Sequence, residues 1–302
     1  MTAPRFFCRD ASLARGESLM GTASTVRRWI LVERASGWHE QAIETFDGET
    51  RALLRAAKRA SGARVLLIRR HGMRREPGAQ LFAAFTGRGR RWLEQRRLAD
   101  LSQLADPTWE ALRRGHSVGL PRVSGPGANG LRFFVCTHGR HDACCARHGR
   151  PVAEALDAHW PKQTWETSHI GGDRFAGNIL VLPLGIYYGR VDPGEAVAVM
   201  QRLAEGELSL PHYRGRTFLP FAAQAAEWHL RQDTGLTGVD ELTMTEHRRK
   251  SDGHTESSFV ARSGRAWNVS VAADEGPLSQ LTCQSTGQHR ATVHRLIAIR
   301  PG

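Results

Sequence analysis

The stretch from Cys136 to Asp173 constrains this chain more than any other part of its sequence. Three of the five cysteines, Cys136, Cys144 and Cys145, fall within ten residues, and the segment from His169 to Asp173 follows after a helix-length spacer. Thiolates beside an imidazole and a carboxylate are donors that bind iron or zinc. The fold therefore has to bring these side chains to one corner.

Length and composition favour a folded protein of two or more domains. The chain has 302 residues, of which 40% are hydrophobic, and it is longer than a chain that usually folds around a single hydrophobic core. No stretch approaches the roughly 20 apolar residues that cross a bilayer, and residues 1 to 18 lack the apolar core of a signal peptide. The expected location is the cytoplasm. Thiols stay reduced there, so five cysteines indicate metal binding or redox chemistry rather than disulfides.

The net charge of +12 raises nucleic acid as a partner. However, the basic residues are nearly all arginines, and they are scattered without an RNP-like, helix-turn-helix or zinc-finger pattern. A solvated basic surface is our first interpretation. An electrostatic dock for an acidic redox partner is the second, and nucleic acid is the third.

The first half of the chain predicts alternating strands and helices. The predicted strands are 26–34, 63–72 and 80–87, and the predicted helices are 48–62 and 106–115. Gly62 is the expected helix stop. Residues 1–25 are expected to be a loop or extended lead-in, in which Cys8 is structural or incidental. The Gly- and Pro-rich segment 116–130 predicts a domain boundary.

The second half repeats this order. It predicts a strand at 131–138, a helix at 150–160 with Pro151 in its first turn, a strand at 163–169, a hairpin at 177–191 and a helix at 192–207 capped by Asp192. A thioredoxin-like domain has this order of strand, helix, strand, hairpin and helix. The first half is then a degenerate copy without the ligands.

The last part of the chain changes character. A further helix is predicted at about 220–232, and alternation between 236 and 302 predicts a small antiparallel extension of four or five strands, including 280–286 around Cys283. No chemistry is recognisable there. The predicted fold class is α/β, with thioredoxin-like domains in a tandem pair and a small C-terminal antiparallel β extension. The predicted domains are 1–122, 131–235 and 236–302.

The predicted elements bring candidate ligands together. One strand ends at Cys136, the next loop returns with Cys144 and Cys145, and His169 ends a neighbouring strand. Gly171-Gly172 permits a tight turn with positive φ, or a close approach of the backbone to a bulky cofactor. Asp173 then points back into the same corner. From the residues alone, iron and zinc are both open.

Three segments carry a resemblance to a known family: CTHGRHDACCARHGRP, WETSHIGGDRFAGNILVLP and YYGRV. They resemble the sucrase/ferredoxin-like family of thioredoxin-like ferredoxins, whose characterised relatives hold a 2Fe-2S cluster on Cys-x8-Cys and His-x-Gly-Gly-His. The resemblance implies Cys136 and Cys145 as the thiolate ligands and His169 as the first histidine. Asp173 stands where the second histidine is expected. Nothing in the sequence supports a sucrase activity.

The aspartate leaves the fourth ligand open. A carboxylate is a harder, anionic donor and should lower the reduction potential relative to a second imidazole. Our expectation is Asp173 as the fourth ligand. The alternatives are that Cys144, His138 or His141 takes that place, or that the cluster is labile or absent.

Several residues also have ordinary structural interpretations. Either of the adjacent cysteines fits a buried small residue, and Asp173 fits a turn aspartate paired with Arg174. The expected surface loop residues are His138, His141 and His148. Tyr187 and Tyr188 are expected to pack in a strand. The expected solvated arginines are Arg190, Arg214 and Arg216.

The predicted function is that of an electron carrier rather than a catalyst. It would hold a 2Fe-2S cluster on Cys136, Cys145, His169 and Asp173, and dock an acidic reductase or oxidase. One alternative is a metal-free thioredoxin-like thiol oxidoreductase or redox sensor that uses Cys144 and Cys145. Another is a structural zinc site on the same ligands. We find no nucleotide-binding loop or Ser-His-Asp order.

Overall fold

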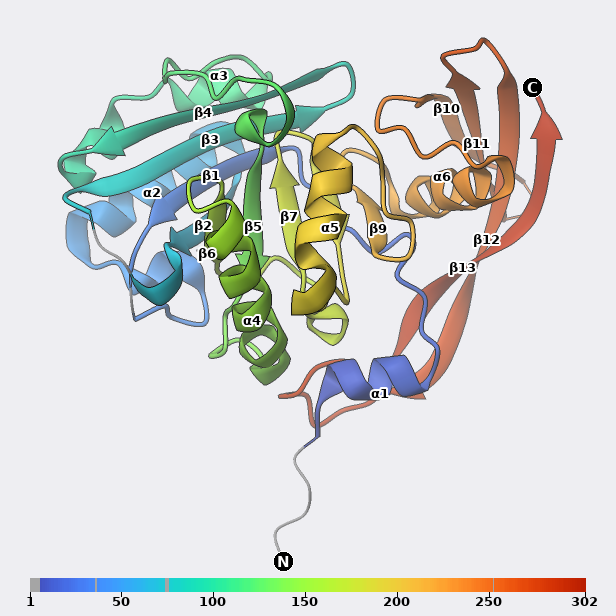
Figure 1. Cartoon of the computed structure of the whole chain (residues 1–302), viewed down its shortest axis with the longest axis horizontal. Helices are drawn as coiled ribbons and strands as arrows, with labels where there is room; N and C mark the ends of the chain where they lie inside the picture. The colour runs from blue at the N-terminus through green and yellow to red at the C-terminus, as the bar shows by residue number, and fades with distance from the viewer. Residues whose placement is uncertain (1–5, 36, 74–75, 252) are drawn as a thin grey trace, which may run out of the picture.

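The computed structural model describes residues 6–35, 37–73, 76–251 and 253–302, and it combines a large curled sheet with a smaller antiparallel one (Figure 1). The predicted mixed α/β class with a small C-terminal antiparallel sheet is confirmed. The thioredoxin-like assignment of each half stays a prediction. Every helix in the described residues is too short or too polar to span a bilayer.

The N-terminal half begins with a short helix and then alternates strands and helices. Its elements are α1 (Cys8–Ala14), β1 (Arg28–Glu33), η1 (Ala42–Thr45), α2 (Gly48–Ser61), β2 (Arg64–Arg69), η2 (His71–Met73), β3 (Ala79–Gly87), β4 (Arg90–Leu98), η3 (Leu101–Ala105) and α3 (Trp109–Arg113). Helix α2 ends at Gly62 with a left-handed φ of 67°, as predicted.

The middle of the chain repeats this order. Its elements are η4 (Gly127–Gly130), β5 (Arg132–Cys136), α4 (Ala143–His159), β6 (Thr164–Thr167), η5 (Asp173–Phe175), β7 (Ile179–Leu182), β8 (Ile186–Tyr188) and α5 (Pro193–Ala204). The predicted cap of α5 is confirmed, because Asp192 and Glu195 form a reciprocal capping box.

The last third adds one strand to the large sheet and then forms the second sheet. Its elements are β9 (Tyr213–Arg216), α6 (Phe221–Thr234), β10 (Leu242–Arg249), β11 (Thr255–Ala261), β12 (Ala266–Ser279) and β13 (His289–Pro301). The predicted antiparallel extension is thus confirmed over β10 to β13.

The described strands of the large sheet run in the order β4-β3-β1-β2-β6-β5-β7-β8-β9. Strand β1 pairs parallel with β2 and antiparallel with β3, and β5 pairs in the same way with β6 and β7. The halves meet where β2 and β6 pair antiparallel, with Ile68 opposite Thr167 and Arg69 opposite Glu166. The segment predicted as a domain boundary is loop and short turn, and strands from both sides of it share one sheet.

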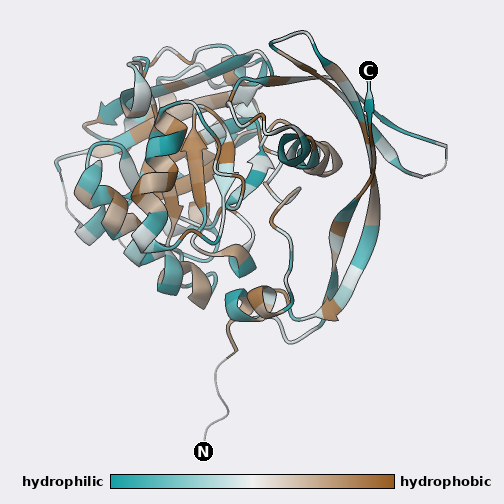
Figure 2. Ribbon diagram, turned by 45° about the vertical axis from the view of Figure 1, so that its right-hand side comes forward, coloured by the Kyte–Doolittle hydropathy of each residue, from teal (hydrophilic) through white to brown (hydrophobic). Residues whose placement is uncertain are grey.

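The curled sheet packs its inner face against itself, while helices cover its outer face. Helices α2 and α3 cover the first half, and α4 and α5 cover the second. On the inner face, Phe82 of β3 meets Phe134 of β5 and Trp165 of β6, with ring centroids 5.7 and 5.5 Å apart. In Figure 2, strands in the middle of the large sheet, behind the covering helices, are coloured brown and are therefore hydrophobic. Cys136 and Cys145 belong to this inner core.

The second sheet packs on α6 through Phe259, Trp267 and Val269. Its last two strands form a long hairpin that runs past α6, so that the turn between β12 and β13 lies beside α1 (Figure 1). This turn contains Cys283 and is a loop, so the strand predicted at 280–286 is wrong.

Two other predictions of local structure are wrong, and two strands were missed. The lead-in predicted at 1–25 contains α1. Helix α4 begins at Ala143 rather than at 150, so Pro151 lies inside it. Strands β4 and β9 were not predicted, because their sequences RRWLEQRRL and YRGR are too rich in arginine to read as buried strands.

Two of the arginines expected to be solvated are buried. Arg214 and Arg216 are 1% and 4% exposed, whereas Arg190 is half-buried. Arg216 and Arg231 lie 3.1 and 2.9 Å from the buried carboxylate of Glu227. Burial opposes ionisation of Glu227, but the two guanidinium charges outweigh it and lower its pKa. This ion cluster ties β9 to α6 and hence to the second sheet.

Candidate metal centre

Helix α4 carries both adjacent cysteines in its first turn. Asp142 is its N-cap, and the carboxylate Oδ1 accepts the Cys144 N–H at 2.8 Å. The sequence prediction of a loop at Cys144 and Cys145 is therefore wrong. The start of a helix favours thiolate over thiol, because the partial positive charge of the helix dipole lies there.

A glycine lets this helix approach the end of β5. A Cβ on Gly149 would overlap the carbonyl oxygen of Cys136. Cys145 lies one turn before Gly149 and faces the same side of the helix. The close approach therefore places the Cys145 thiol beside Cys136.

The side chains of Cys136, Cys145, His169 and Asp173 converge at this point. The ligand atoms of the first three all lie within 4.8 Å of one another. The Cys145 thiol donates to Asp173 Oδ1 at 3.1 Å, and His169 Nδ1 lies 2.9 Å from the same oxygen. Both cysteines and the aspartate are buried, whereas the His169 side chain is 20% exposed. The structure thus brings the four sequence-predicted residues together.

Two further histidines line the open side of this group. The His141 ring stacks on His169 with centroids 3.6 Å apart, and its Nε2 lies 3.9 Å from Asp173 Oδ2. His138 is 2% exposed, and its Nδ1 accepts the His169 N–H at 3.2 Å. The expectation of a surface loop residue is wrong for His138, whereas His141 lies in the loop before α4 with its side chain 29% exposed. His141 stays an alternative ligand.

Two imidazole nitrogens beside this group are buried without a hydrogen bond from the described residues, His138 Nε2 and His141 Nδ1. The third histidine differs, because His169 Nδ1 is paired with the Asp173 carboxylate. A buried nitrogen without a partner is costly unless it binds something else.

The double glycine forms the predicted turn with positive φ. Gly171 and Gly172 have φ of 102° and 80°, and a Cβ on Gly172 would overlap the Arg214 guanidinium. Arg214 donates to the Gly171 carbonyl at 3.0 Å. From the other half, Arg64 donates to the carbonyls of His169 and Ile170 at 2.7 and 3.1 Å. The buried Arg214 and the half-buried Arg64 thus fix the segment that carries His169 and Asp173.

The charges of the group are strongly linked. A hydrogen bond from Cys145 lowers the pKa of the Cys136 thiol well below its usual value against the effect of burial, and the same contact together with burial raises the pKa of Cys145. Burial disfavours charge on His169, yet contacts with Asp173 and Cys136 raise its pKa to about 9. Asp173 keeps a lowered pKa in spite of burial because His169 is its neighbour.

The contacts of Cys144, Arg174 and the two tyrosines of β8 test further expectations from the sequence. Cys144 Sγ lies 3.4 Å from Cys283 Sγ and hydrogen-bonds with Cys8, so it faces a different cluster from Cys145. Arg174 lies 2.6 Å from Glu17 rather than pairing with Asp173. Tyr187 and Tyr188 are buried in β8, as predicted.

A basic pocket opens on the histidine side. It has a volume of about 790 Å³ and is lined by His138, His141 and His169 together with residues of α2 and η1. Its charged lining residues are Glu40, Glu44, Arg55, Lys58, Arg59 and Arg64. The thiol side of the group is therefore closed, and the histidine side is accessible.

A family model described as sucrase/ferredoxin-like matches residues 19–215, which is more than half of the 302 residues. The chain belongs to the sucrase/ferredoxin-like family. The matched region contains Cys136, Cys145, His169 and Asp173 but neither Cys8 nor Cys283. The family resemblance read from the sequence is thus confirmed.

This sucrase/ferredoxin-like protein is also similar to altered inheritance of mitochondria protein 32 from Candida glabrata. The two are 29% identical over 102 residues, which cover 29% of this chain and 33% of the relative. The similarity thus spans about a third of the relative's length. No solved structure gives a significant match to the chain.

We predict that Gly149→Ala will destabilise this sucrase/ferredoxin-like protein by about 1–3 kcal/mol, because the new methyl group overlaps the Cys136 carbonyl. Glycine to alanine within a helix ordinarily stabilises by about 0.5–1 kcal/mol. Urea unfolding followed by circular dichroism measures the change. The control is Gly194→Ala in α5, where the added Cβ meets no described atom within 4 Å apart from its chain neighbours and the backbone of its own helix. Equal effects of the two changes would contradict this account of the helix-strand contact.

Proposed function

We propose that this protein binds a 2Fe-2S cluster through Cys136, Cys145, His169 and Asp173 and carries electrons. The observation that carries the proposal is the convergence of two buried thiols, an imidazole and a carboxylate in a member of the sucrase/ferredoxin-like family. When bound, such a cluster supplies one-electron redox chemistry.

The donor set fits this group. Two thiolates suit one iron, and a nitrogen with an oxygen donor suits the other. Cys136 contacts Cys145 and His169, and Asp173 also contacts Cys145 and His169, so the four donors enclose a common centre.

The surrounding residues hold the donors rigid. The thiols lie in the inner core shared by both halves, which excludes water. Arg64 and Arg214 fix the backbone of the glycine turn, and Asn178 bonds both Arg214 and the Gly172 carbonyl. Electrons would enter and leave on the histidine side, where the group is exposed to the basic pocket.

A metal-free thiol oxidoreductase that uses Cys144 and Cys145 as a pair gains no support from the described contacts. The Cys144 and Cys145 thiols point to different partners, Cys144 toward Cys8 and Cys283 and Cys145 toward Cys136 and Asp173. They do not form a thiol pair with each other. A single zinc ion on the same donors is the competing interpretation, because the ligand atoms of Cys136, Cys145 and His169 lie within 4.8 Å of one another, close enough for one ion.

The test is purification under anaerobic conditions. We expect about two irons and two acid-labile sulfides per chain, with a visible absorption and an EPR signal after reduction. Cys136→Ser should abolish both, because a serine oxygen is a poor substitute for a soft thiolate ligand. The zinc interpretation would replace the proposal if three results are found together. The purified protein would hold stoichiometric zinc, Cys136→Ser would lose that zinc, and reconstitution would add no iron.

Asp173→His should raise the reduction potential of the iron-loaded protein by on the order of 100 mV, because a neutral imidazole replaces an anionic carboxylate. Protein-film voltammetry measures the shift. The control is Asp157→Asn in α4, which changes the charge by the same amount outside the four-residue group. If Asp157→Asn and Asp173→His shift the potential equally, Asp173 is not a ligand.

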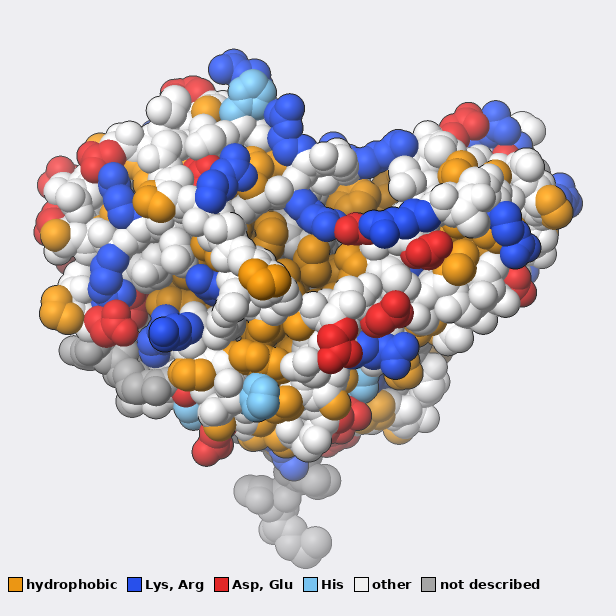
Figure 3. Space-filling view, turned by 45° about the horizontal axis from the view of Figure 1, so that its top comes forward, with side chains coloured by type: hydrophobic (Ala, Val, Ile, Leu, Met, Phe, Trp, Pro, Cys, Tyr) orange, Lys and Arg blue, Asp and Glu red, His pale blue; other side chains and the backbone are white. Residues whose placement is uncertain are grey.

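For the partner we propose an acidic redox protein that docks at the basic pocket. Arg55 is already paired with Glu44 at 2.7 Å, and Arg64 holds the glycine turn. Lys58 and Arg59, both exposed on α2, are the cations we assign to docking. On the face shown in Figure 3, basic side chains are spread over several patches, so a local effect has to be separated from the overall positive charge.

Ferricyanide can stand in for the acidic partner as an anionic one-electron oxidant. We expect the double change Lys58→Glu and Arg59→Glu to slow oxidation of the reduced protein by about tenfold at low salt, with the difference shrinking as salt is added. Stopped-flow absorbance measures the rate. The matched control is Arg88→Glu with Arg90→Glu, which line a separate pocket of about 400 Å³. If the two double variants slow the oxidation equally, docking at the basic pocket is contradicted.

A further inference from the structure

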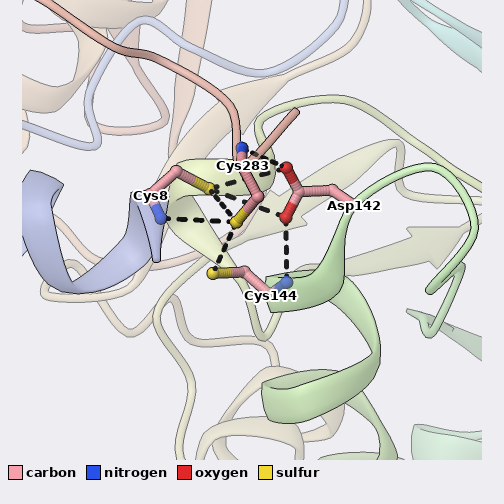
Figure 4. Close-up of side chains that lie close together, drawn as sticks. All are labelled: Cys8, Asp142, Cys144 and Cys283. Atoms are coloured by element: carbon pink, nitrogen blue, oxygen red, sulfur yellow. Dashed lines mark hydrogen bonds between the residues drawn. The ribbon is translucent and has the colours of Figure 1, made fainter. Parts of the chain in front are cut away.

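The remaining cysteines form a second cluster outside the proposed redox centre. Cys8 comes from α1, Asp142 and Cys144 from the start of α4, and Cys283 from the turn between β12 and β13 (Figure 4). Cys8, Cys144 and Asp142 have no solvent exposure, and Cys283 is half-buried. Segments 275 residues apart in sequence thus point their sulfurs to one place.

The spacing of these donors is that of a four-coordinate metal site. Cys283 Sγ lies 3.4 Å from Cys144 Sγ and 3.6 Å from Cys8 Sγ, and Cys8 Sγ lies 3.7 Å from each Asp142 oxygen. All four ligand atoms lie within 4.8 Å of one another. A tetrahedral zinc ion with Zn–S bonds of about 2.3 Å separates its sulfurs by about 3.8 Å.

A disulfide explains the arrangement less well. It would use two of three nearly equivalent sulfurs and leave a thiol buried against the Asp142 carboxylate. The cluster also has the supporting hydrogen bonds of a metal site. The Cys8 N–H donates to Cys283 Sγ at 3.4 Å, and the Cys283 N–H donates to Asp142 Oδ2 at 2.7 Å.

We propose that Cys8, Cys144, Cys283 and Asp142 bind one zinc ion, which clasps the N-terminal helix and the C-terminal hairpin to the start of α4. This proposal does not depend on the iron centre. Three thiolates select a soft or borderline cation, and the start of α4 favours their anionic form. Arg9, which hydrogen-bonds to Asp192 and lies 3.2 Å from His148 Nδ1, adds positive charge beside the cluster.

The place where α1, the start of α4 and the β12–β13 turn meet has a small apolar core. The apolar residues around it are Phe6, Phe7 and Ala176, apart from the cysteines themselves. The far end of the β12–β13 hairpin extends beyond the part that packs on α6, and an isolated two-stranded ribbon is marginally stable in water. A zinc ion at its turn would supply the anchor, because metal binding free energy adds to folding free energy.

The test uses the adjacent cysteines as matched variants of the full chain. Zinc, iron and sulfide are measured by mass spectrometry and colorimetry after anaerobic purification. We expect about one zinc ion per chain in the unaltered protein, and at least a tenfold loss of zinc on Cys144→Ser with iron retained. Cys145→Ser, one residue further along the same helix, should keep its zinc. If iron is absent from every protein, the zinc comparison still decides this proposal.

Variants at a second position show whether a loss of zinc comes from the missing ligand or from misfolding at α4. Cys283→Ser, far away in sequence, should lose zinc in the same way, whereas Cys283→His, which keeps a zinc ligand, should retain it. Removing zinc with a chelator should also expose the turn at 280–288 to proteolysis. The proposal is overturned if Cys144→Ser and Cys283→Ser keep their zinc, or if zinc is lost only with Cys145→Ser. A Cys144–Cys283 disulfide in the anaerobically purified protein would overturn it as well.

Discussion

The close contact between α4 and β5 is the constraint on which both cysteine clusters depend. It requires that residue 149 has no side chain, since a Cβ there would overlap the Cys136 carbonyl. Because Cys145 lies four residues earlier, it faces the same strand and meets Cys136. Successive helix residues are rotated by about 100°, so Cys144 turns away toward α1 and the β12–β13 turn. The contact at Gly149 thus places Cys145 in one cluster, and the rotation between successive helix residues places Cys144 in the other.

The half of the large sheet without ligands supports the half that has them. Pairing of β2 with β6 places Arg64 against the carbonyls of His169 and Ile170, and Arg69 within 2.6 Å of Glu166. The Trp38 ring contacts His138 edge-on, with centroids 5.7 Å apart. The candidate centre is therefore enclosed by both halves, although its four proposed ligands come from the second. The strands of the first half thus support the candidate centre without supplying a cysteine to it.

Much of the fold follows from local sequence, and the misses have physical causes. The hairpin at 177–191, the cap at Asp192 and the glycine stop at Gly62 rest on neighbouring residues, and each is present. The candidate ligands were found because motif spacing marks them. The sequence does not mark Cys8 and Cys283 as candidate ligands. They meet only once the large sheet and the β12–β13 hairpin have formed, and no spacing of residues in the sequence indicates that contact. Arg214 looked solvated because its partners, the carbonyls of Thr22 and Gly171, are distant in sequence.

The start of α4 joins the two sites mechanically. The Asp142 carboxylate caps the helix through Oδ1 and accepts the Cys283 N–H through Oδ2, so the helix start and the hairpin turn share one side chain. Cys145 lies three residues further on, in the same turn. An electron carrier works best when its ligands move little between redox states, which a helix held from both sides provides. Gly149 holds α4 against the sheet from within, and the cysteine cluster holds it from the two ends of the chain. The C-terminal extension then contributes to the candidate centre by fixing the helix that carries Cys145, without supplying one of its four proposed ligands.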